Sequence, residues 1–222
     1  MRIAELIDDK LIPLRTMDTV TSSMQSMLDH KVNNLPLIDF TTKKLIGEVL
    51  MQDLELVRRK DASVMMHRSE LVAKVSADQH IFEAARILSK YNRQVVSVLD
   101  QEGNYLGIVS RRDVLEALSG MLNLAERGSV ITIELEEKDF VLSDIVRIIE
   151  LESAKILGLT VEHPDEQNDR FRVSIKLNLD DLTKVNAALR RYGYVITLET
   201  KSETSDVEFL DRADEFIRFL NI

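Results

Sequence analysis

An internal repeat constrains the fold of this chain more than any other feature. Two segments are similar when the sequence is offset by sixty residues, and Gly47, Asp53 and three further positions have the identical residue in both copies. Apolar residues recur at the equivalent strand and helix positions. We therefore predict two units of the same fold, about residues 1–60 and 61–124. They should pack together, because one unit alone is too small to bury the face of its own sheet.

Each unit is predicted to contain a helix, a strand, a turn, a strand and a helix. In the second unit, apolar residues at helical spacing and β-branched runs indicate these elements at residues 79–91, 95–99, 105–110 and 111–122. In the first unit, the corresponding strands are expected at residues 35–39 and 45–49. This pattern is typical of the α/β class.

The repeat ends near residue 124, and a different pattern begins. Strands with alternating apolar residues and two amphipathic helices predict the order βαββαβ across residues 128–200. This order is typical of an α+β domain with its helices on one face of an antiparallel sheet. Residues 206–222 repeat apolar positions at helical spacing, which predicts a C-terminal amphipathic helix.

Composition excludes several classes of function. The 222 residues contain no cysteine, which excludes thiol chemistry and a cysteine zinc site, and the net charge of -9 opposes nucleic-acid binding. No apolar stretch reaches the roughly 18 residues of a membrane span. The acidic start lacks the pattern of a secretory signal, so a cytoplasmic protein is expected. The four histidines lie far apart, and neither a metal site nor a catalytic centre is expected.

The best candidate site is the segment from Gly107 to Asp113, where a predicted strand runs directly into a helix. The unpaired N–H groups and the dipole of a helix N-terminus favour a phosphate. Ser110 adds a hydroxyl donor, and Arg111 and Arg112 add cationic donors. The carboxylate of Asp113 could accept the hydroxyls of a ribose, and Gly107 would let a flat base approach.

The same residues have a purely structural interpretation. The pattern Ser-x-x-Asp is nearly a capping box, in which Ser110 and Asp113 satisfy the amides of their own helix. The first repeat retains Gly47 and Asp53 but has Leu50 in place of the hydroxyl residue. We therefore predict a second, weaker site at Gly47 and Asp53, and one competent site per chain.

The two units, with their Gly-x-x-(Ser/Thr)-x-x-Asp ends, resemble a tandem CBS-domain pair, the Bateman module. The βαββαβ segment resembles an ACT domain, and the layout is similar to that of bacterial acetoin-utilisation proteins. The CBS resemblance covers about residues 1–124 and the ACT resemblance about residues 128–200. It implies a CBS-domain pair followed by a ferredoxin-like ACT domain.

The resemblance implies a regulatory protein that binds an adenine nucleotide, with Asp113 at the ribose and Ser110 at the phosphate. The base would lie between the two units, near Val95 and Ile12. No cofactor is required for a reaction, because no enzyme is expected. A homodimer and a regulated protein partner are implied.

Two alternatives remain open. The chain could be a dimeric scaffold that binds no ligand, or an amino-acid sensor that uses the ACT interface. The turn after the first ACT-like strand, residues 137–142, lacks the glycine that such amino-acid sites use. Pairing of two chains through the ACT-like sheets is therefore the favoured role of this domain.

Overall fold

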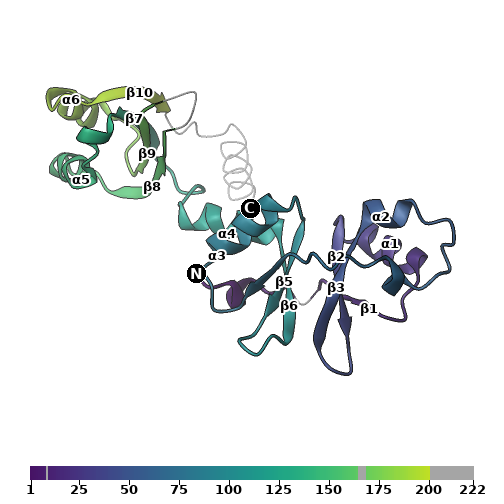
Figure 1. Cartoon of the computed structure of the whole chain (residues 1–222). Helices are drawn as coiled ribbons and strands as arrows, with labels where there is room; N and C mark the ends of the chain where they lie inside the picture. The colour runs from purple at the N-terminus through teal and green to yellow at the C-terminus, as the bar shows by residue number, and fades with distance from the viewer. Residues whose placement is uncertain (9, 165–168, 201–222) are drawn as a thin grey trace, which may run out of the picture. The chain divides into compact units, whose positions relative to one another are not determined.

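The computed structural model describes residues 1–8, 10–164 and 169–200; the predicted C-terminal helix at residues 206–222 lies outside them. The chain divides into two compact units, Met1–Leu118 and Ser119–Ile222 (Figure 1). The first unit holds the repeat, and the second holds the βαββαβ region. In the part of the chain that is described, no helix is both long and apolar enough to cross a bilayer.

Each repeat forms a three-stranded sheet flanked by two helices (Figure 1). The elements of the first repeat are β1 (Leu14–Arg15), α1 (Val20–Asp29), β2 (Asn34–Asp39), β3 (Lys44–Leu50) and α2 (Met51–Glu55). Those of the second are β4 (Lys74–Ser76), α3 (Ile81–Lys90), β5 (Val95–Leu99), β6 (Tyr105–Ser110) and α4 (Arg111–Met121).

The predicted element order is confirmed, and each repeat has an additional first strand. Strands β1 and β4 are short, and each pairs in parallel with the middle strand of its sheet. A parallel neighbour requires a crossover connection, which α1 and α3 provide. Strands of two or three residues carry too little alternation to be recognised from the sequence.

The gapless offset of sixty residues is wrong by one residue over part of the repeat. Thr19 and His80 are equivalent helix N-caps. Asn34 pairs with Leu50, the last residue of β3, and Val95 pairs with Ser110, the last residue of β6. Asn34 and Val95 are therefore equivalent as well. The offset returns to sixty in β3 and β6, because the chain between paired residues is one residue shorter in the second hairpin.

The segment that precedes each repeat packs against the other repeat. Ile3 N donates to Gln79 O and Asp8 N to Ile108 O, both at 2.9 Å, so the amino-terminal segment lies on the second repeat. The linker does the same for the first repeat, where Val64 N donates to Asp18 O at 2.9 Å. Ile3 and Val64 are fully buried.

A buried polar cluster joins the two repeats. Asn34 Nδ2 donates to Glu48 Oε1 at 2.6 Å and to Val95 O at 2.9 Å. Arg93 Nε donates to Glu48 Oε2 at 2.9 Å. Burial raises the pKa of Glu48, while the hydrogen bonds and charge of Arg93 and the hydrogen bond of Asn34 oppose this change. The cluster thus fixes β2 and β3 of the first repeat against the start of β5 in the second repeat.

The second unit is a four-stranded antiparallel sheet with the strand order β10-β7-β9-β8. Its elements are β7 (Ser129–Leu135), α5 (Leu142–Leu151), β8 (Ile156–Glu162), β9 (Phe171–Leu177), α6 (Thr183–Arg191) and β10 (Val195–Thr200). The predicted order βαββαβ is confirmed, and the strand order is that of a ferredoxin-like sheet. One face of the sheet packs against both helices, through a core that includes Ile133, Ile148, Val173 and Leu189.

Candidate functional site

The candidate site begins at the junction of β6 and α4, where strand and helix follow each other without a loop. Ser110 Oγ donates to Asp113 Oδ2 at 2.5 Å, and Asp113 N donates to Ser110 Oγ at 3.1 Å. Ser110 N also donates to Asp113 Oδ2, at 3.2 Å. These contacts form the reciprocal capping box that the structural interpretation predicts. They also fix both side chains in place, and Asp113 Oδ1 has no hydrogen-bond partner among the described residues.

The same turn lines a cavity of about 790 Å³ in the first unit. Its walls come from four segments that are distant in the sequence: the amino-terminal segment, the end of α1, the start of β5 and the first turns of α4. The lining residues are Asp8, Lys10, Leu11, Asp29, His30, Lys31, Val32, Gln94, Ser110, Arg111, Arg112, Asp113, Leu115 and Glu116. A cavity of this volume can hold a ligand of nucleotide size.

Four of the predicted site residues line this cavity: Ser110, Arg111, Arg112 and Asp113. The two arginines have partners of their own. Arg111 Nη2 donates to Leu88 O at 3.2 Å, and Arg112 Nε forms an exposed ion pair with Glu116 at 2.8 Å. Each guanidinium thus has a contact within the protein, and the anion contact of Arg111 and Arg112 stays a prediction.

Three other predicted residues do not line the cavity. Val95 is fully buried within the hydrophobic core, whereas Ile12 has an exposed side chain. At Gly107 an added Cβ would lie 2.4 Å from Ile7 Cγ2. The missing side chain of Gly107 thus makes room for Ile7 of the amino-terminal segment.

The predicted weaker site in the first repeat shows the same use of glycine. A Cβ on Gly47 would lie 2.9 Å from Ser69 O, because the linker crosses the strand at this point. Leu50 is the N-cap of α2 and provides no side-chain hydrogen bond. Asp53 lies in the first turn of α2, with no side-chain partner among the described residues. Neither Gly47 nor Asp53 lines the cavity at α4.

Sequence analysis missed the residues that close the cavity opposite α4, above all Lys10, His30, Lys31 and Gln94. Nothing in the local sequence marks them, since each belongs to a turn or an irregular segment. The crossing of the amino-terminal segment brings Lys10 to the second repeat. The prediction that the two units pack together was the one indication that residues of both repeats could line the same cavity.

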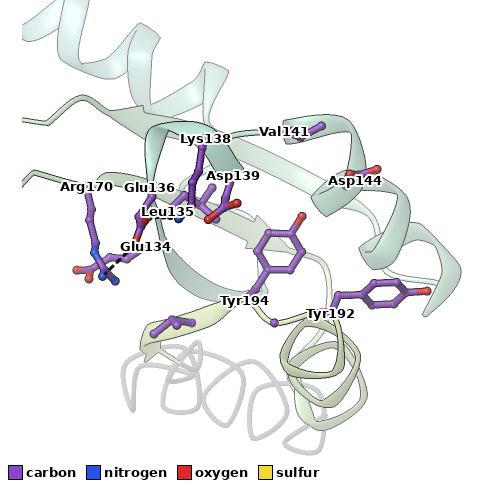
Figure 2. Close-up of a pocket in the computed structure, with 12 residues that line it drawn as sticks. Glu134, Leu135, Glu136, Lys138, Asp139, Val141, Asp144, Arg170, Tyr192 and Tyr194 are labelled. Carbon is purple, nitrogen blue, oxygen red and sulfur yellow. Dashed lines mark ion pairs between the residues drawn. The ribbon is translucent and has the colours of Figure 1, made fainter.

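A second cavity, of about 540 Å³, lies in the second unit at the turn between β7 and α5 (Figure 2). Figure 2 shows the ring of Tyr194 beside Asp139, and the side chain of Tyr192 pointing away from it. Glu136 forms ion pairs with Lys138 at 2.7 Å and with Arg170 at 3.6 Å. Both cations at this cavity are thus near a carboxylate. Burial and the nearby charges of Asp144 and Asp139 raise the pKa of Tyr194.

Comparisons with known proteins place a family domain in the first unit. Residues 63–120 match the CBS domain model. An uncharacterized protein of Methanocaldococcus jannaschii is 38% identical over 85 residues, which is 38% of this chain and 49% of that protein. Inosine-5'-monophosphate dehydrogenase of Aquifex aeolicus is 28% identical over 102 residues, 44% of this chain and 20% of the enzyme. The chain spans less than half the length of these curated relatives.

Several solved structures are similar to part of this chain. A CBS domain pair/ACT domain protein from Thermotoga maritima has a TM-score of 0.49 and 24% identity, covering 54% of this chain and 98% of that one. CBSX2 in complex with AMP has a TM-score of 0.46 and 21% identity, over 54% and 96%. The CBS domain model thus matches the second repeat, and the first repeat has the same strand order as the second.

Proposed function

We propose that this chain is a regulatory protein that binds an adenine nucleotide in the cavity at the start of α4. The observation that carries the proposal is the position of Ser110 and Asp113, the two polar residues of the motif, in the wall of a cavity large enough for a nucleotide. The match of residues 63–120 to the CBS domain supports it.

The capping box is compatible with binding because it orients both side chains before the ligand arrives. Asp113 Oδ2 accepts two hydrogen bonds from Ser110, and Oδ1 can accept a ribose hydroxyl. The N-terminus of α4, a helix of 11 residues, favours the negative phosphate. The ligand would contact both repeats, so binding favours the arrangement in which they are closed together. A protein partner can respond to this shift in population.

Thermal unfolding with AMP, ADP, ATP, S-adenosylmethionine and free amino acids tests the proposal. A nucleotide at about one hundred times its dissociation constant should stabilise the fold by roughly 2.7 kcal/mol. Ser110→Ala and Asp113→Ala should each lose about 1 kcal/mol of stability with the cap and should abolish the ligand shift.

Thr19→Ala is the matched control, because Thr19 caps α1 through an equivalent box with Ser22. It should lose similar stability and retain the full nucleotide shift. If the Ser110 and Asp113 variants both retain the shift, the ligand binds elsewhere. If no nucleotide changes the melting temperature, the scaffold alternative is favoured.

For the second unit we propose an ACT-like domain that pairs two chains into a homodimer. Its strand order supports the ACT likeness. The cavity at the β7–α5 turn favours a second candidate function, an amino-acid sensor, because it has carboxylates and cations for both charged ends of an amino acid. Stabilisation by a free amino acid in the same thermal series would support this alternative.

A further inference from the structure

We infer that Lys10 and Lys31, together with His30, recognise the phosphate end of the ligand and set how strongly each nucleotide binds. This inference rests on the proposed nucleotide site, and it assigns the phosphate contact to residues outside the Ser110–Asp113 motif. All three side chains line the cavity. Two come from the end of α1 in the first repeat, so the phosphate would be held across the two repeats.

The charged side chains around the cavity differ in whether they already have a hydrogen-bond partner. Each carboxylate in the wall accepts a hydrogen bond from within its own segment: Asp8 from Lys10 N, Asp29 from Gln25, Asp113 from Ser110 and Glu116 from Arg112. Arg111 and Arg112 are likewise engaged. In contrast, the Lys10, His30 and Lys31 side chains have no hydrogen-bond or ion-pair partner among the residues described. They are the cationic and polar groups most available to an entering anion.

The backbone at the end of α1 holds Lys31 in a fixed place. Val32 N donates to Met27 O at 2.9 Å and Lys31 N to Leu28 O at 3.1 Å, which is the Schellman pattern, and Lys31 has a φ of 54°. At the equivalent end of α3, Asn92 occupies this left-handed position, with a φ of 48°. Asparagine tolerates that conformation better than lysine. The first repeat thus has a long cation in a costly conformation at the cavity wall, where the second repeat has a short amide.

Calorimetric titration of the full chain with adenosine, AMP and ATP tests the inference. Affinity should increase from adenosine to AMP and ATP. Lys31→Met and Lys10→Met should each weaken AMP binding about tenfold, the size of one lost charge-assisted hydrogen bond, and leave adenosine binding unchanged. Lys31→Arg should retain most of the AMP affinity.

Lys43→Met is the matched control, since Lys43 is an exposed lysine in the same unit with a φ of 55° and does not line the cavity. It should not change any affinity. Unchanged AMP affinity in both lysine variants, or an equal loss for adenosine, would overturn the inference and leave the nucleotide site standing. A wild-type chain that binds neither adenosine nor AMP would overturn the proposed function as well.

Discussion

The hydroxyl group of Tyr105 is buried without a hydrogen-bond partner among the described residues. Burial raises the pKa of this phenol, so it stays protonated at neutral pH and cannot gain stability by ionising. A buried, unpaired polar group costs about 1–3 kcal/mol. We expect Tyr105→Phe to raise the free energy of unfolding by about 1 kcal/mol and the melting temperature by roughly 3 °C. Tyr91→Phe, which removes the hydroxyl of a half-buried tyrosine, is the control. A decrease in stability would show that the hydroxyl has an acceptor in solution.

At the residue scale, the sequence predicted the contacts within the motif but not the contacts of the motif with distant residues. Ser110 and Asp113 lie where the pattern places them, because a capping box is determined by residues three apart in one helix turn. Arg111 and Arg112 could not be assigned in this way. Their partners, Leu88 O and Glu116, depend on the packing of α3 and on rotamers of exposed side chains.

At the element scale, the equivalent glycines Gly47 and Gly107 are explained by the segment that crosses the strand of each. Gly107→Ala would force Ile7 Cγ2 to move, because the added Cβ would lie 2.4 Å away. We expect a loss of about 1–3 kcal/mol in urea unfolding. In an Ile7→Ala background the same substitution should cost much less, because the clashing methyl group is gone. Additive losses in this double-mutant cycle would contradict the proposed contact.

The order of the elements was largely predictable, whereas the pairing of segments was not. Alternation and helical spacing are local signals, and they predicted the paired hairpins of the repeats and the whole βαββαβ order. The strands β1 and β4 and the crossing of residues 2–8 onto the second repeat depend on contacts with distant residues. For this reason the sequence did not indicate that Lys10 and Lys31 line the cavity and that Ile12 and Val95 do not.

At the scale of the whole molecule, Glu48 ties the stability of the first unit to pH. A carboxyl whose pKa is raised on folding binds its proton more tightly in the folded chain. Its contribution to stability is therefore fully present below the ordinary value of 4.5 and is lost as pH rises through the folded pKa. The free energy of unfolding of the wild type, compared with that of Glu48→Gln, should fall as pH rises above about 4.5.

Urea unfolding at several pH values between 4 and 8 measures this difference. Glu55→Gln, on the exposed side of α2, is the control for the loss of one negative charge. If the difference between the wild type and Glu48→Gln rises with pH, the Arg93 ion pair outweighs the effect of burial on the Glu48 carboxyl.

Residues 2–8 pack on the second repeat and residues 62–69 on the first, so a cut at the border of the sequence repeat would disrupt both repeats. A fragment with only the first repeat would keep the amino-terminal segment, which packs on the second repeat, and would lose the linker that packs on its own sheet. A fragment with only the second repeat would have the opposite defect. We therefore expect neither repeat to fold independently, because each fragment would expose the core residues that Ile3 or Val64 packs against in the intact chain. Mixing the two fragments should restore what either alone has lost.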